Sequence, residues 1–76
     1  MTSQPAYPGY ATPTFTREGS DWDVTATPWG RRVGAVSNFG PVGWVAVDHR
    51  GLYVGLFPDK QAAGEALVKH AGYEVL

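Results

Sequence analysis

The chain has 76 residues, of which 43% are hydrophobic and 17% charged, and its formal net charge is -1 at pH 7. A chain of this length forms one domain at most and buries only roughly 60% of its extended-chain surface, so its core is small. The near-neutral charge lacks the basic excess of a dedicated nucleic-acid binder, and the absence of cysteine excludes disulfides and thiolate metal sites.

Residues 1–20 are rich in proline and threonine and show no hydrophobic periodicity, a composition that favours an extended arm. The arm carries Tyr7, Tyr10 and Phe15, and aromatic side chains on an extended segment can fill pockets on a neighbouring surface. The alternative is a loose tail in which these aromatic residues are incidental.

The first strand is predicted over residues 21–27, where polar and apolar residues alternate. This alternation places Trp22, Val24 and Ala26 on one face and the polar residues on the other. The sequence TPWG that follows is typical of a type I turn, and it places Trp29 at the tip of that turn.

Three further strands are predicted over residues 32–39, 44–48 and 52–57. The last two form a hairpin, because Gly51 supplies the positive φ that a short loop with a bulge requires. Alternation along this hairpin predicts one apolar face in the core, made by Val45, Val47, Leu52, Val54 and Leu56.

A helix is predicted after Pro58, with Asp59 as its N-cap. Small apolar residues recur at helical spacing and predict a helix that lies close against the sheet. These residues are Ala62, Ala63, Ala66, Leu67 and Ala71. Gly72 is a natural end of the helix, after which residues 73–76 form a short edge strand or fold back on the helix end.

The predicted fold is therefore α+β, with a small antiparallel sheet of three or four strands packed against one C-terminal helix. Residues 1–20 form an extended arm, and residues 21–76 form a single small ββββα domain. The spacing and composition of the elements, rather than any enzyme motif, carry this prediction.

Residues 43–71 resemble the three-strand-plus-helix module of the AP2 domain and of the N-terminal arm-binding domains of phage-type integrases. The matching residues are Trp44, Val45 and Ala46 in the middle strand, Val54, Gly55 and Phe57 in the last strand, and Ala62, Ala63 and Ala66 in the helix. In that family Arg and Trp side chains on the sheet face contact the major groove of DNA. The resemblance implies nucleic-acid contacts by Trp44, Arg31, Arg32 and Arg50, although here the strands carry Val, Ala and Ser where the family has Arg and Lys.

No catalytic or phosphate-binding motif is present: the sequence lacks G-x-S-x-G, H-E-x-x-H, G-x-x-x-x-G-K-[ST] and G-x-G-x-x-G. We expect His49 to be a solvated turn residue and His70 to complement the helix dipole. Asp21 and Asp23 point the same way on one strand, which suits a cation site or an acidic edge that discourages strand pairing. The sequence therefore predicts no enzyme, no cofactor and no metal site.

The cluster of Trp29 with Arg31 and Arg32, together with Arg50 in another loop, suits three roles. It can grip phosphates or stack on a base, it can form a protein interface hot spot, or Trp29 can pack on its own sheet beside solvated arginines. The first role corresponds to a small DNA-binding regulator that uses the face of its sheet.

The leading functional prediction is a non-catalytic binding or assembly protein that docks on a protein partner or on copies of itself. Small accessory or structural proteins of bacteriophages have this general build. The predicted docking residues are Tyr7, Tyr10, Phe15 and Trp29. The apolar-looking run over residues 33–47 is too short and too broken to span a membrane, and no secretory signal is evident. We therefore expect a cytoplasmic protein, or a virion component, without a small-molecule substrate.

Overall fold

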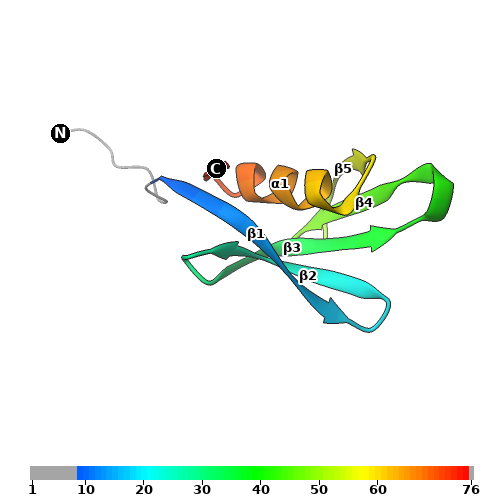
Figure 1. Ribbon diagram of the computed structural model, residues 1–76, viewed down its shortest axis with the longest axis horizontal. Helices are drawn as coiled ribbons and strands as arrows, with labels where there is room; N and C mark the ends of the chain where they lie inside the picture. The colour runs from blue at the N-terminus through cyan, green and yellow to red at the C-terminus, as the bar shows by residue number, and fades with distance from the viewer. Residues whose placement is uncertain (1–8, 76) are drawn as a thin grey trace.

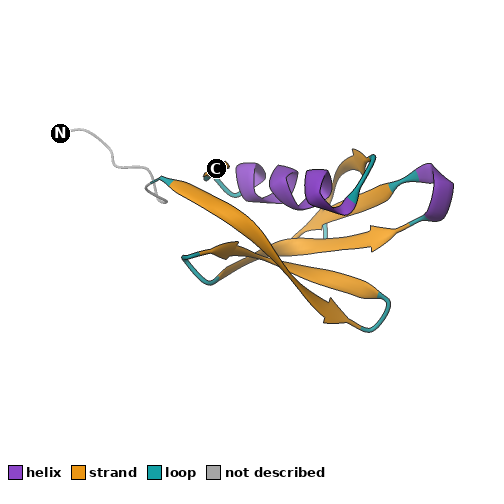
Figure 2. Ribbon diagram, viewed as in Figure 1, coloured by secondary structure: helices purple, strands orange, loops and turns teal. Residues whose placement is uncertain are grey.

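Six strands form one sheet, and a single α-helix packs on one of its faces (Figure 1, Figure 2). The computed structural model describes residues 9–75. The elements are β1 (Tyr10–Glu18), β2 (Asp21–Thr27), β3 (Arg31–Asn38), the 3-10 helix η1 (Gly40–Val42), β4 (Trp44–Asp48), β5 (Tyr53–Phe57), α1 (Lys60–His70) and β6 (Glu74–Val75). The strand order is β5-β4-β3-β2-β1-β6, and every pair is antiparallel except β1 with β6, which is parallel.

The predicted sheet of three or four strands with an extended arm is wrong, because the sheet has six strands and β1 lies where the arm was predicted. Strand β6 is the short edge strand that was one of the two alternatives for the residues after Gly72. Strand β1 lies within residues 1–20, pairs with β2 from Thr12 to Glu18, and turns Ala11 into the core. Pro13 obscured the alternation of β1 in the sequence. Beyond Ala11 the outer side of β1 pairs with no other described strand, and such an edge position tolerates a proline.

The sheet curls around α1 as an open half-barrel, and Figure 1 shows β1 and β2 crossing the direction of the more distant strands. The pairing register shifts in two places, between β2 and β3 at Val24/Thr25 and between β4 and β5 at Ala46/Val47. Such bulges bend a strand and increase its twist, so the sheet bends at these two positions.

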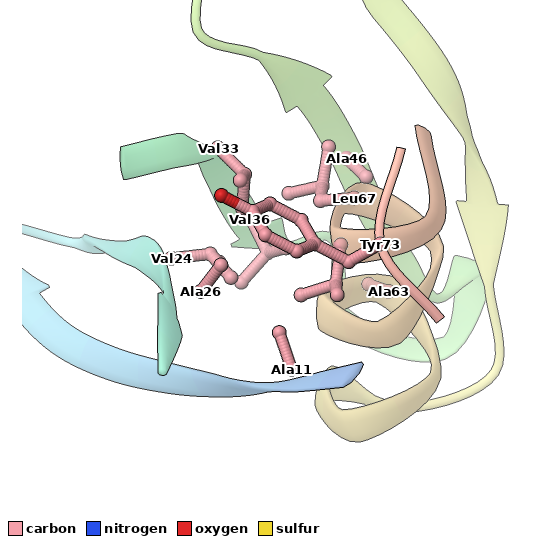
Figure 3. Packing of buried hydrophobic residues seen from close by; sticks show 10 residues of the cluster. Ala11, Val24, Ala26, Val33, Val36, Ala46, Ala63, Leu67 and Tyr73 are labelled. Carbon is pink, nitrogen blue, oxygen red and sulfur yellow. The ribbon is translucent and has the colours of Figure 1, made fainter. Parts of the chain in front are cut away.

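The core lies between the concave face of the sheet and α1, and it is made mostly of small side chains. It contains Ala11, Val24, Ala26, Val33, Val36, Ala46, Ala63, Leu67, Val68 and Tyr73. Figure 3 shows Leu67 and Tyr73 among the alanines and valines of the sheet. Gly34 lies beneath Leu67, and a β-carbon there would lie 3.0 Å from Leu67 Cδ2 and would also clash with the Val47 carbonyl oxygen of β4, so helix and sheet approach closely at this position.

The predicted core face of the β4–β5 hairpin is wrong. Ala46 and Asp48 face the helix and are buried, Val45 and Val47 are half-buried, and Leu52 and Leu56 are 56% and 46% exposed. Of the predicted set, Val54 alone packs partly against the core. Both faces of this hairpin carry apolar residues. The helix packs on the face where the paired Ala46 and Gly55 leave room for it, with the larger pair Trp44 and Phe57 beside them.

The helix begins and ends as its sequence predicts. Asp59 is confirmed as the N-cap, since its carboxylate accepts a hydrogen bond of 2.8 Å from the backbone N–H of Ala62. Gly72 has φ 105° and reverses the chain, so that the N–H of Tyr73 donates to the carbonyl of Val68. The chain then enters β6. Neither α1 nor any other described helix has the length and apolar character that crossing a membrane requires.

Candidate functional site

The predicted aromatic anchors have different environments. Tyr7 lies outside the described residues. Tyr10 begins β1 and is 56% exposed. The indole Nε1 of Trp29 donates a hydrogen bond of 3.1 Å to the carbonyl oxygen of Tyr10. The Trp29 ring also stacks on Tyr73, with centroids 6.2 Å apart and an angle of 21° between the planes. Trp29 therefore closes one end of its own sheet, although it keeps a partly exposed face.

Phe15 turns inward from β1 and packs on the helix. A β-carbon at Gly64 would overlap the Phe15 ring, which shows how closely the ring approaches the helix backbone. The ammonium of Lys60 lies 4.9 Å from the centroid of Phe15 and 3.9 Å from that of Trp22. Such contacts are cation–π interactions. This cluster holds the first turn of α1 against β1 and β2, so Phe15 contributes to the fold.

The four residues that the DNA-binding resemblance implies do not share one face. Trp44 packs partly against the core on the helix side. Arg32 forms an ion pair of 3.0 Å with Asp23 on the opposite side of the sheet. Arg50 lies 3.4 Å from the carboxylate of Asp48 in the β4–β5 loop. Arg31 is exposed at the start of β3. The sheet therefore does not present these side chains together.

Asp48 is the one buried charged residue among the described residues, and sequence analysis did not single it out. Its Oδ1 accepts hydrogen bonds from the backbone N–H groups of Arg50 (2.9 Å) and Leu52 (3.0 Å). Its Oδ2 lies 3.4 Å from Arg50 Nη2 and 3.5 Å from His70 Nε2. The carboxylate thus holds the hairpin loop closed and joins it to the C-terminal end of α1. Its position at a strand end before a glycine-containing turn was the available sequence signal.

The environment of Asp48 lowers the pKa of its carboxyl group below the ordinary value of 3.8. The hydrogen bond from the Leu52 N–H makes the largest contribution. Burial acts in the opposite direction, and the hydrogen bonds and charge of Arg50 lower the pKa further. His70 and Asp48 face no pocket within residues 9–75. Asp48 therefore connects the end of β4 to the end of α1 and has a structural role.

The side of the sheet that faces away from α1 carries an apolar patch over β3, β4 and β5. Cross-strand pairing places Ala35 beside Val47 and Val47 beside Tyr53 in one row. A second row pairs Val45 with Leu56. We call these five residues the outer patch. Antiparallel partners lie on the same face, and the buried Ala46 shows that its neighbours along β4 point away from the helix.

The outer patch is exposed and uncharged. Tyr53 is 67% exposed and Leu56 46% exposed, while the other three members are half-buried. The remainder of the same face, on β1 and β2, is polar and includes Thr16 and Asp23. Figure 2 shows α1 on the opposite side of the sheet and η1 at one end of β3 and β4, so no described element covers the outer patch. Sequence analysis identified Val45, Val47 and Leu56 as apolar strand residues but assigned them to the core.

Comparisons with known proteins identify no relative: no family model matches the chain, and neither the curated proteins nor the solved structures gave a match.

Proposed function

We propose that the chain is a non-catalytic binding or assembly protein and that the outer patch is its binding surface. One observation carries the proposal: Tyr53 and Leu56 are 67% and 46% exposed on a face that no described element covers, while the core is built mostly of alanine and valine. An exposed apolar patch that borders a polar surface, here on β1 and β2, is typical of a protein interaction site.

The energetics favour occupation of this face. Fully burying a side chain the size of Leu or Phe is worth about 1.5–3 kcal/mol relative to leaving it in water. Tyr53 adds a rigid aromatic ring, a residue type that is enriched at interface hot spots. A partner that covers Tyr53, Leu56 and the half-buried Val47 therefore gains apolar burial without separating any charged group of the patch from water.

A protein-binding role fits the arginines better than a DNA-binding role. Arg32 and Arg50 lie beside the carboxylates of Asp23 and Asp48, so binding a phosphate would compete with these contacts. Only a few cations would remain for the duplex, and binding affinity for DNA depends strongly on the number of phosphates neutralised.

Site-specific photo-crosslinking tests the proposal. Leu56 is replaced by a photo-crosslinking residue, and the labelled chain is irradiated in the cells that naturally produce it. We expect a discrete protein adduct at position 56. The control places the same group at Thr16, on the polar half of the same face, where we expect no such adduct. Equal labelling at both positions, or none at position 56, contradicts the outer patch as the binding surface.

A further inference from the structure

We infer that the occupant of the outer patch is a second copy of this chain, packed face to face around a two-fold axis. This inference rests on the proposed function and adds the identity of the partner. In such a dimer the β3–β5 region of each copy forms one layer of a two-layer arrangement, with the layers about 10 Å apart.

Charge is the first argument for a second copy. A two-fold interface brings the same surface of both copies together. An unpaired charge near its centre therefore lies close to the identical charge of the other copy, and the two repel each other. The outer patch contains no charged residue. At its β2 side, Asp23 and Arg32 neutralise each other in an ion pair within one copy, and the carboxylate of Asp21, at the border of the patch, accepts a hydrogen bond of 2.8 Å from the Ser37 hydroxyl. The whole chain carries a net charge of only -1, so repulsion between copies is weak.

The distribution of side-chain size is the second argument. The ten core residues include four alanines and four valines, whereas Tyr53 and Leu56 lie outside. A chain of this length has a marginal core of its own. Face-to-face packing lets the bulky residues of each copy fill the space above the small Ala35 and between the valines of the other. The two outer patches together then form a second apolar core between the copies.

Pairing through a free sheet edge is the competing geometry for two copies, and the described residues leave two such edges, the outer side of β1 beyond Ala11 and the outer side of β5. The edge of β1 contains Pro13, which has no N–H to donate to an added strand. The second edge is that of β5. This edge is short, since β5 has five residues, and Gly55 lies at its centre. The register shift leaves Val54 without a partner on β4, so the hydrogen-bond ladder of β5 is irregular there. Short edge strands and bulges are the features by which natural sheets discourage edge pairing. The side chains of the face, rather than the backbone of the edge, therefore provide the contact.

Area determines how tight this dimer is. Three strands about 4.8 Å apart and five residues at about 3.3 Å per residue span roughly 14 by 17 Å. A stable interface buries about 800 Å² per partner, which is about one sixth of the 4707 Å² surface of the chain. The outer patch alone is smaller than such an interface. It therefore forms the centre of the contact, and the residues around it supply the remaining area. We expect a dimer at the weak end of specific complexes, in exchange with monomer.

Sedimentation equilibrium of the purified full chain over a range of concentrations tests the inference. We expect a monomer–dimer equilibrium in which Leu56→Lys weakens association at least about tenfold. Thr16→Lys adds the same charge to the polar half of the face and should leave association unchanged. Tyr53→Lys, at the more exposed position, provides a second variant if Leu56→Lys does not fold. A monomer at all concentrations, or equal association in Leu56→Lys and Thr16→Lys, overturns the inference.

Chemical cross-linking distinguishes the geometry, because the chain contains no native cysteine. A single Leu56→Cys thiol should join two copies through a short bis-maleimide, whereas Gln61→Cys on the exposed side of α1 should not. Failure of this inference is separable from failure of the proposed function. A monomeric chain that still forms a photo-adduct at position 56 with a different protein retains the binding surface but excludes the second copy.

Discussion

The imidazole Nε2 of His70, at the end of α1, lies 3.5 Å from the buried carboxylate oxygen Oδ2 of Asp48, at the end of β4. This contact joins two elements that are 22 positions apart in the sequence. The same carboxylate caps two backbone N–H groups of the β4–β5 loop. The end of the hairpin and the end of the helix are therefore fixed by one side chain.

Replacement of Asp48 should lower the melting temperature, and Asp48→Ala should lower it more than Asp48→Asn. The alanine leaves the N–H groups of Arg50 and Leu52 without their acceptor, whereas the asparagine keeps an oxygen for them and loses only the charge. Thermal unfolding followed by circular dichroism measures the order. Equal melting temperatures for Asp48→Ala and the parent chain contradict the structural role of this carboxylate.

The pH dependence of stability should contain a contribution from Asp48. Because the fold lowers the pKa of this carboxyl group, its stabilising effect is present above the ordinary value of 3.8 and is lost as the pH falls toward the lower pKa of the folded state. Urea unfolding from pH 7 down into this acidic range measures the effect. In Asp48→Asn the acid-induced loss should be smaller, and an identical pH profile in both chains would exclude this contribution.

Two leucines test the assignment of the core. Leu67 is fully buried between the helix and the sheet, so Leu67→Ala should lower the free energy of unfolding by about 2–5 kcal/mol. Leu52 is 56% exposed, and Leu52→Ala should change this free energy by no more than about 0.5 kcal/mol. Chemical denaturation at a dilution that keeps the chain monomeric provides the comparison. Similar losses in the two variants would restore the prediction that Leu52 belongs to the core.

Truncation distinguishes β1 from an independent arm. Removal of residues 1–18 deletes a strand that lies between β2 and β6 and that contributes Ala11 and Phe15 to the packing, so we expect the remaining chain to unfold. Removal of residues 1–8 leaves every described strand intact and serves as the control. Amide spectra by NMR report the outcome. A folded protein after removal of residues 1–18 would support the extended arm that the composition predicts.

Local signals predicted the elements of the chain better than their arrangement. Alternation identified β2, and Asp59 and Gly72 marked the two ends of the helix, because caps and turns depend on neighbouring residues. Strand β1 was missed because Pro13 is read as a strand breaker, and only its position at the side of the sheet makes it acceptable. A local pattern does not reveal which side of a strand has a neighbour.

The candidate site was less accessible to sequence analysis for a related reason. Val45, Val47 and Leu56 are as apolar as core residues, and the direction in which they point depends on which face the helix covers. The helix lies against Ala46 and Gly34 because small residues allow its backbone to approach. That choice depends on packing between distant segments. A burial assignment made from hydrophobicity alone therefore placed the outer patch on the wrong side.

Isotope-filtered NOE spectroscopy on a mixture of labelled and unlabelled chains tests the surface most directly. We predict contacts between copies from the methyl groups of Val45, Val47 and Leu56 to the aromatic ring of Tyr53, and none from the buried methyl groups of Leu67. A concentrated sample in which the outer-patch methyl groups show no contact with the other copy, or in which contacts arise only from the surface of α1, would contradict the dimer.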